Sequence, residues 1–388
     1  MIFVKNIKIT LLAILVIFCI LAVASANDLP EASGMPSSVP PENSRTSRNN
    51  SNIRTIYFPI MFYTPETSLG LGLAAITLFR GSRPAGADFP RLNIFGMYSF
   101  NNEYVFGISP EYVTRNQKYA FRLDASIRNG TSQFFGLGNN TSEDDSENFS
   151  LKTSSLGFTA YRRILRNLRM GVRAEYSSFS IYGLESGGML STAAAANGRH
   201  IAGTENSHRA GAGIIICFNN NRASLSPTQG TRLRLKYMYH SRNILSDYEY
   251  SYIKADFRRY ITLSENYFFA YQILGEFING TAPFMYLPKL GGQSLLRGIT
   301  RGRYSDNILI AFQPELQRRI SRNVKGVLFC GIGNVYRNVE SIDLSRLHFS
   351  GGVGARLRIA QNPAINLRLD VGFSKDARGV YFGIMEAF

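Results

Sequence analysis

Residues 365–373 read Ile-Asn-Leu-Arg-Leu-Asp-Val-Gly-Phe, with an apolar side chain at every odd position and a polar residue or glycine at every even one. Residues 231–240 and 347–359 alternate in a similar way, with leucine, tyrosine, valine or phenylalanine opposite arginine, lysine or histidine. A helix would repeat its apolar residues every three or four positions, whereas a strand repeats them every two. These stretches therefore predict strands that have one apolar and one charged face.

Sixteen segments of this kind follow one another, and several tight links, such as residues 116–117, contrast with several long ones. The long links are residues 129–150, 183–206, 279–306 and 335–345. Outer-membrane barrels have short periplasmic turns and long extracellular loops. The sequence therefore predicts an all-β fold, a sixteen-stranded antiparallel transmembrane β-barrel over residues 55–388 with both chain ends on the periplasmic side. The predicted strands are residues 56–63, 68–80, 91–100, 103–115, 118–128, 151–163, 167–182, 207–218, 230–243, 249–263, 266–278, 307–320, 323–334, 346–360, 363–373 and 379–388.

Residues 1–26 have the three parts of a secretory signal peptide. Lys5 and Lys8 form a basic start, an apolar stretch follows, and residues 24–26, Ala-Ser-Ala, match the small-residue cleavage pattern. A permanent membrane helix is the alternative, but no basic flank follows the apolar stretch. Residues 27–54 are rich in Asn, Pro, Ser, Glu and Arg and predict a disordered linker. We therefore expect the chain to be exported to the bacterial outer membrane.

A soluble β-sandwich or propeller is the alternative fold, because one buried and one wet face also produce alternation. Such a fold leaves the export signal, the unequal links and the terminal aromatic residue unexplained. In a membrane every backbone N–H and C=O needs a partner, so a spanning sheet must close on itself. The last segment predicts a lipid-facing row of Phe382, Ile384 and Phe388, interrupted by Glu386. This row resembles the C-terminal signal that the outer-membrane assembly machinery reads.

The chain has a formal net charge of +16, and its basic residues are spread along the predicted strands at every second position. Nucleic-acid binding uses basic residues that are clustered on one face or along one helix, so no nucleic-acid partner is expected. The charge predicts instead a basic lumen, which in an open pore favours anions because like charges repel cations. The predicted lumen residues are Arg232, Arg234, Lys236, Arg356, Arg358 and Arg368.

Residue types that usually carry chemistry are scattered along the chain. The four histidines lie on separate segments without the spacing of a metal site. The sequence has neither a nucleophile elbow nor a phosphate-binding loop. We therefore predict no enzyme, no cofactor and no metal. Cys217 and Cys330 fall on strands that are far apart in the predicted order, so they predict no disulfide.

The long link at 279–306 contains the most distinctive motif of the chain. Residues 290–299 read Leu-Gly-Gly-Gln-Ser-Leu-Leu-Arg-Gly-Ile, and residues 301–307 read Arg-Gly-Arg-Tyr-Ser-Asp-Asn. This stretch resembles the inward-folding loop of the bacterial surface antigen superfamily, which includes assembly proteins of the BamA and TamA type and two-partner secretion transporters. In that family a Val/Leu-Arg-Gly-Phe/Tyr tip folds into the barrel; here Ile299 replaces the aromatic residue. Residues 226–231, Ser-Pro-Thr-Gln-Gly-Thr, and the end of the chain also resemble the family.

The resemblance implies a lock for the loop tip, Arg297 and Gly298. A guanidinium group drawn into a barrel loses hydration and must be paired with a carboxylate. The family pattern places one acid on the twelfth strand, where Glu315 fits, and one in a Phe-x-Asp-x-Gly motif on the thirteenth. Here Phe329 offers a packing surface, but Gly331 stands where that second acid would be. We therefore expect a lock with one carboxylate, which Gly331→Asp would tighten.

The resemblance also implies a function. Assembly and secretion members carry periplasmic POTRA domains ahead of the barrel, whereas residues 27–54 are too few for one, so the chain resembles a short, barrel-only branch. We expect an outer-membrane barrel that assists insertion or translocation of proteins or lipids through a weakly sealed seam between its first and last strands. The alternatives are a passive anion-favouring channel or structural barrel, and a membrane anchor for a periplasmic partner enzyme. The expected partners are outer-membrane lipid and either unfolded outer-membrane proteins or a periplasmic partner.

Overall fold

The computed structural model describes residues 53–64, 68–79, 88–99, 102–142, 144–195, 198–221, 226–361, 364–375 and 377–388. Within these ranges the side chains of residues 58–64, 68–69, 360–361, 364–365 and 384 are not described. The predicted signal peptide lies outside the described residues, as does the predicted linker apart from residues 53 and 54.

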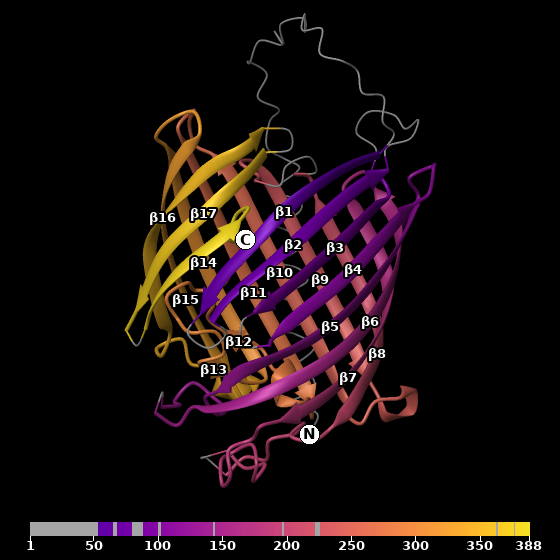
Figure 1. Ribbon diagram of the computed structural model, residues 1–388, viewed down its shortest axis with the longest axis vertical. Helices are drawn as coiled ribbons and strands as arrows, with labels where there is room; N and C mark the ends of the chain where they lie inside the picture. The colour runs from indigo at the N-terminus through magenta and orange to yellow at the C-terminus, as the bar shows by residue number, and fades with distance from the viewer. Residues whose placement is uncertain are drawn as a thin grey trace, which may run out of the picture.

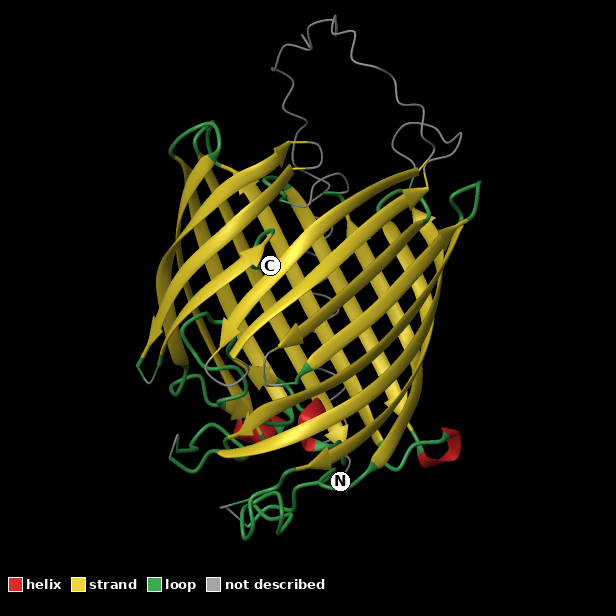
Figure 2. Cartoon of the chain, in the orientation of Figure 1, coloured by secondary structure: helices red, strands yellow, loops and turns green. Residues whose placement is uncertain are grey.

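Sixteen strands form one antiparallel sheet, which curls round into a barrel (Figures 1 and 2). Each strand pairs with the next along the chain, except that β11 pairs with β14. Between those two, β12 (Lys289–Leu290) and β13 (Tyr304–Ser305) form a small separate sheet within the connecting loop. The barrel strands are β1 (Ile53–Thr64), β2 (Ser68–Phe79), β3 (Arg91–Ser99), β4 (Tyr104–Val113), β5 (Tyr119–Phe134), β6 (Glu147–Leu165), β7 (Leu168–Tyr182), β8 (Ser207–Asn219), β9 (Gly230–His240), β10 (Tyr250–Thr262), β11 (Tyr267–Gly280), β14 (Ile308–Arg319), β15 (Val324–Tyr336), β16 (His348–Gln361), β17 (Ala364–Ser374) and β18 (Arg378–Ile384).

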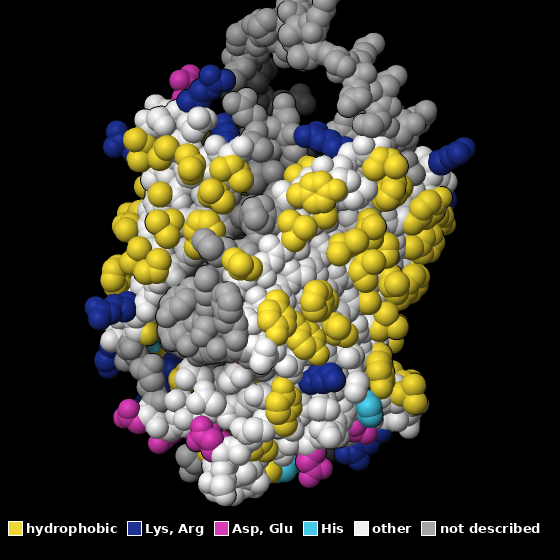
Figure 3. Space-filling model, in the orientation of Figure 1, with side chains coloured by type: hydrophobic (Ala, Val, Ile, Leu, Met, Phe, Trp, Pro, Cys, Tyr) yellow, Lys and Arg dark blue, Asp and Glu magenta, His cyan; other side chains and the backbone are white. Residues whose placement is uncertain are grey.

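Alternation along the strands places apolar side chains on the outside of the barrel. On β16 and β17, Val353 and Leu369 are 55% and 48% exposed, whereas Arg356 and Asp370 on the opposite parity are 1% and 0% exposed. Figure 3 shows hydrophobic side chains over the outer surface and charged ones towards its two ends. An apolar band between polar rims is the surface that an outer-membrane barrel presents to lipid.

Three single 3₁₀ turns lie in the links at one rim of the barrel (Figure 2). They are η1 (Arg242–Ile244), η2 (Phe284–Tyr286) and η3 (Val339–Ser341). None of the helices in the described parts of the chain is long and apolar enough to cross a membrane. The long links gather at this rim, which is therefore the extracellular one.

The long links pack against one another and form a cap at the extracellular rim. Phe134, Leu190 and Phe284 are at most 5% exposed and belong to one apolar cluster, although they come from three different parts of the chain. An ion pair of 2.9 Å between Arg199 and Asp306 joins the link after β7 to the loop between β11 and β14. The extracellular loops therefore form a packed layer with a core of its own.

The first and last strands of the sheet, β1 and β18, lie next to each other. Within the described residues, however, no backbone ladder joins them. β18 is seven residues long, whereas β1 has twelve and pairs with β2 along its whole length. Met385 then adopts a left-handed conformation with φ of 73°, and the chain turns out of the sheet. This seam is the only junction of neighbouring strands without backbone pairing in the described part of the barrel.

The sixteen predicted strands are confirmed, with differences at their ends. β5 and β6 are longer than predicted, because their ladder continues from Asn129↔Lys152 to Phe134↔Glu147 and carries the hairpin into the cap. The last strand is shorter than predicted: it ends at Ile384 because the left-handed Met385 interrupts the alternation.

Candidate functional site

The loop between β11 and β14 folds into the barrel, as the sequence predicted. Its two short strands pair Lys289 with Ser305 and Leu290 with Tyr304. Leu290, Leu296 and Ile299 are at most 3% exposed and pack against apolar residues of β11, β14 and β15. Each fully buried leucine or isoleucine stabilises such a contact by about 1.5–3 kcal/mol. Apolar packing therefore holds the loop inside the barrel independently of its ion pairs.

Arg297 at the loop tip is 1% exposed and lies between two carboxylates. Its Nη2 donates to Glu315 Oε2 at 2.7 Å, and its Nη1 donates to Asp370 Oδ2 at 2.5 Å. Its Cζ lies 3.6 Å from the centroid of the Phe329 ring, which covers one face of the guanidinium. Charge-assisted hydrogen bonds and a stacked aromatic ring together offset part of the lost hydration of a buried arginine. The Nε of Arg297 has no hydrogen-bond partner within the described residues.

Arg356 on β16 shares both of these carboxylates. Its Nη1 donates to Asp370 Oδ1 at 2.5 Å, and its Nη2 lies 3.3 Å from Glu315 Oε1. Its Nε donates to Glu386 Oε2 at 2.8 Å, and Arg368 Nε lies 3.7 Å from Asp370 Oδ2. The group thus holds three arginines and three carboxylates, with a formal charge of +3 − 3 = 0. We call these six residues, Arg297, Glu315, Arg356, Arg368, Asp370 and Glu386, the lumen charge cluster.

The expectation of a single carboxylate was wrong. Asp370 on β17 provides the second carboxylate, from a different strand than the motif around Gly331 indicated. The expected benefit of Gly331→Asp is not supported either. A Cβ at Gly331 would lie 3.2 Å from both Gln313 Cβ and Leu296 Cγ, which leaves little room for an added side chain.

The two glutamines beside Glu315 on the same face of β14 lie next to the loop, as expected, but they bind Glu315 and the loop backbone and not the Arg297 guanidinium. Gln317 Nε2 donates to Glu315 Oε1 at 2.8 Å. Gln313 Oε1 accepts the backbone N–H of Leu296 at 3.1 Å, and Gln313 Nε2 donates to the carbonyl of Ser294 at 2.9 Å. Gln313 therefore binds the loop backbone just before its tip, and Gln317 supports the carboxylate that Arg297 binds.

The tip also contacts the last two strands. The backbone N–H of Gly298 donates to the Tyr381 hydroxyl on β18 at 2.9 Å, and Ser374 Oγ donates to the Gly298 carbonyl at 2.9 Å. Gly298 has φ of 109°, and a Cβ at Gly372 would lie 2.6 Å from the backbone carbonyl of Arg297. Tyr381 and Gly372 could not be found from the sequence pattern, because their role depends on how closely the loop backbone approaches β17 and β18 inside the lumen.

The C-terminal tail, residues 385–388, lies inside the barrel. Glu386 Oε1 accepts from Asn366 Nδ2 at 2.7 Å, in addition to its contact with Arg356. Phe388 is 8% exposed and packs with Tyr260 and Ala270 of β10 and β11. The predicted lipid-facing position of Phe388 was therefore wrong, because the chain leaves the sheet at Met385. Phe382 faces outward and is 45% exposed, whereas the Ile384 side chain lies outside the described residues.

All six predicted lumen residues lie on the strand face opposite the exposed apolar row, but acidic residues neutralise part of their charge. Lys236 pairs with Glu175 at 3.0 Å, and Arg356 and Arg368 belong to the lumen charge cluster. Arg232, Arg234 and Arg358 form no ion pair within the described residues. The lumen is therefore a network of ion pairs with a basic excess, and not a uniformly basic surface.

Residues 94–388 match the Omp85 superfamily domain. The chain belongs to the Omp85 superfamily. Among solved structures, it is similar to BamA from Haemophilus ducreyi lacking POTRA domains 1–3, with a TM-score of 0.60 and 14% identity over 86% of this chain and 70% of that one. It is also similar to CdiB from Acinetobacter baumannii and from Escherichia coli, with TM-scores of 0.53 and 0.55 and identities of 12% and 11%. Those two matches cover 86% of this chain and 59% and 62% of the CdiB chains.

At these identities the likeness to solved structures concerns the fold. No curated protein matches the sequence. The Omp85 match confirms the resemblance that the loop motif predicted and identifies the chain as an outer-membrane β-barrel protein. Within the described residues, no group of three or more histidine, cysteine or acidic side chains is placed to hold a metal ion.

Proposed function

We propose that this Omp85 protein assists the insertion of other proteins into the outer membrane. The observation that supports this most is the docking of the loop tip. Arg297 binds carboxylates on β14 and β17, and the neighbouring Gly298 binds Tyr381 on β18. The buried loop is thus linked to the strand beside the seam, where the barrel has no backbone ladder within the described residues.

Within the described residues, the facing edges of β1 and β18 share no backbone ladder and are available to an incoming strand. A strand at the edge of a sheet is a template for another strand, because its free N–H and C=O groups need partners. In a membrane that need is stronger, since no water reaches these groups. An unfolded outer-membrane protein provides such strands, so it is the substrate class that we propose.

The extracellular cap favours insertion over passive conduction. The long links pack around Phe134, Leu190 and Phe284 at that rim, and the inward loop occupies part of the lumen. A channel for solutes needs an open path from rim to rim. We therefore expect no steady conductance from the wild-type barrel in a planar bilayer.

A reconstitution experiment tests the proposal. The purified barrel is placed in liposomes, an unfolded outer-membrane protein is added, and its folding is followed by heat-modifiable migration in a gel. We expect faster folding than in empty liposomes. Glu315→Gln, which weakens loop docking, should reduce the acceleration, whereas Glu265→Gln in an exposed turn should not.

Depletion in cells provides the second measurement. The proposal expects the levels of several outer-membrane proteins to fall when this barrel is depleted. Unchanged levels together with a steady anion-selective conductance would identify a passive channel instead. Loss of a single periplasmic enzyme from the membrane fraction, with all barrels unchanged, would identify an anchor.

A further inference from the structure

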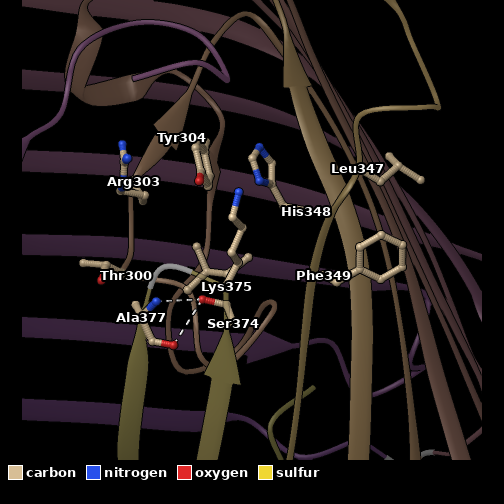
Figure 4. Close-up of a pocket in the computed structure, with 10 residues that line it drawn as sticks. Thr300, Arg303, Tyr304, Leu347, His348, Phe349, Ser374, Lys375 and Ala377 are labelled. Atoms are coloured by element: carbon tan, nitrogen blue, oxygen red, sulfur yellow. Dashed lines mark hydrogen bonds between the residues drawn. The ribbon is translucent and has the colours of Figure 1, made fainter. Parts of the chain in front are cut away.

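The outer wall of the barrel carries an apolar groove that crosses β3 to β7. A smaller cavity of about 150 Å³ lies between the extracellular ends of β16 and β17, where the inward loop backs it (Figure 4). The groove has a volume of about 450 Å³ and lies on the lipid-facing side, where Figure 3 shows hydrophobic side chains. We call it the wall groove. Its large lining side chains are 38–50% exposed and are Ile94, Phe106, Ile108, Ile127, Leu156 and Tyr176.

Small side chains form the floor of the wall groove. Ala125 on β5 lies between Ile108 on β4 and Leu156 on β6, and Ser154 on β6 lies directly opposite Ile127. The lining residues and their neighbours along the chain all lie within the described ranges. An unfilled hollow costs the contacts of the atoms around it, and the hydrocarbon of a membrane contains no water to fill it. An apolar group must therefore occupy the wall groove.

Polar side chains lie at the extracellular end of the wall groove. On β6, Lys152 is the next outward residue after Ser154 towards that rim, and it is exposed. Ser178 and Ser180 on β7 lie directly opposite Ser154 and Lys152. The hydroxyl groups of these three serines and the ammonium group of Lys152 form no hydrogen bond or ion pair within the described residues. We call Lys152, Ser154, Ser178 and Ser180 the headgroup patch.

The headgroup patch lies where the outward side chains change from apolar to polar. On β5 the outward positions change from Ile127 to Asn129, and Asn129 lies directly opposite Lys152. On β6 they change from Leu156 to Ser154. The change lies towards the rim that carries the long loops, and thus at the level of the outer-leaflet headgroups. A cation on the lipid-facing side costs little at this level and much more near the midplane.

We propose that the headgroup patch and the wall groove together bind a phosphate-bearing lipid of the outer leaflet. Lys152 and the serine hydroxyls donate to the phosphate, and one acyl chain lies in the groove. One positive charge and three hydroxyl groups suit the acceptor oxygens of a phosphate, and the apolar lining next to them suits the chain. This site is independent of protein insertion, because it shares no residue with the lumen charge cluster.

Native mass spectrometry of the detergent-solubilised protein tests the site. The probes are diphosphorylated lipid A, its enzymatically dephosphorylated form, and inorganic phosphate. We expect the wild type to retain one molecule of the diphosphorylated form about tenfold more strongly than the dephosphorylated form. Lys152→Gln should abolish this preference, because it removes the charge-assisted hydrogen bond to the phosphate.

Ala125→Leu tests the wall groove separately from the headgroup patch. The added side chain is apolar at a lipid-facing position, so it suits the membrane, but it occupies the space of the acyl chain. Retention of both lipid forms should weaken about tenfold, because the loss of contact for about two CH₂ groups corresponds to that factor.

Arg162→Gln and Ala174→Leu are the matched controls. Arg162 is exposed on the same strand and the same outward face as Lys152, but it lies near the periplasmic end. Ala174 is exposed on the outward face of β7 and does not line the wall groove. Both variants should retain the lipid as the wild type does. Heat-modifiable migration verifies that all four variants are folded.

Four results would overturn the proposal. Equal retention by the wild type, Lys152→Gln and Ala125→Leu would place the lipid elsewhere. Equal weakening by Lys152→Gln and Arg162→Gln would indicate a general charge effect. Displacement of the lipid by inorganic phosphate at a matching concentration would identify a site for a free anion. A protein dimer that Ala125→Leu dissociates would identify the wall groove as an interface between two copies of this chain.

Discussion

Glu315→Gln is the sharpest test of the docked loop, because it removes one charge while preserving shape. Glu315 is 2% exposed and accepts from Arg297 at 2.7 Å and from Arg356 at 3.3 Å. The substitution changes the lumen charge cluster from a formal charge of 0 to +1. Removing one partner of a buried ion pair costs on the order of 3–5 kcal/mol, because the other partner is left as an unpaired buried charge. Because Asp370 still binds both arginines, we expect a cost at the lower end of this range, about 3 kcal/mol. This cost corresponds to a roughly hundredfold larger population of the undocked loop.

Hydrogen exchange followed by mass spectrometry measures this population directly, since local opening exposes backbone amides to solvent. The informative peptides cover residues 291–303, which include the N–H groups bound by Gln313 and Tyr381. Exchange there should rise roughly a hundredfold in Glu315→Gln, whereas Glu265→Gln should behave like the wild type. Equal exchange in all three proteins would mean that the Glu315 carboxylate does not hold the loop.

Three further substitutions test the remaining contacts. Gly372→Ala places a methyl group 2.6 Å from the loop-tip carbonyl and should undock the loop in the same exchange measurement, whereas Gly351→Ala, with its nearest atom at 3.5 Å, should not. Tyr381→Phe removes the hydroxyl that accepts the loop-tip amide and should cost about 1 kcal/mol, seen as faster exchange of that amide alone; unchanged exchange would argue against the contact. Glu386→Gln leaves Arg356 with one carboxylate fewer and should lower the midpoint of thermal unfolding, measured by heat-modifiable migration. A midpoint equal to that of the wild type would indicate that the tail does not stabilise the barrel.

The sequence predicted the strands because alternation is a local property. Residues such as Val353 and Leu369 determine which face meets lipid, and the unequal links determine which rim is extracellular. Arg297, Glu315 and Phe329 were found because the loop motif resembles a known family. Alternation also placed Arg356 and Asp370 on the inner face of their strands.

The odd or even position of a residue along its strand shows which face it lies on, but not which inward residues contact one another across the lumen. Asp370 and Arg297 are 73 positions apart, and their contact depends on how far the loop descends into the closed barrel. Tyr381 and Glu386 were missed for the same reason. Phe388 was assigned to the wrong face because Met385, a residue type that rarely adopts positive φ, carries no sequence signal for the turn that it makes.

The buried position of Phe388 has a consequence for the biogenesis of this barrel. Its partners, Tyr260 and Ala270, belong to β10 and β11, more than a hundred residues earlier in the chain. Contacts between segments so distant in sequence form late, because a long loop must be closed first. If the terminal aromatic residue is the signal that the assembly machinery recognises, the machinery can bind it only before this last contact forms. Burial of the tail then makes the signal inaccessible, so that a fully folded barrel is no longer recognised by the machinery.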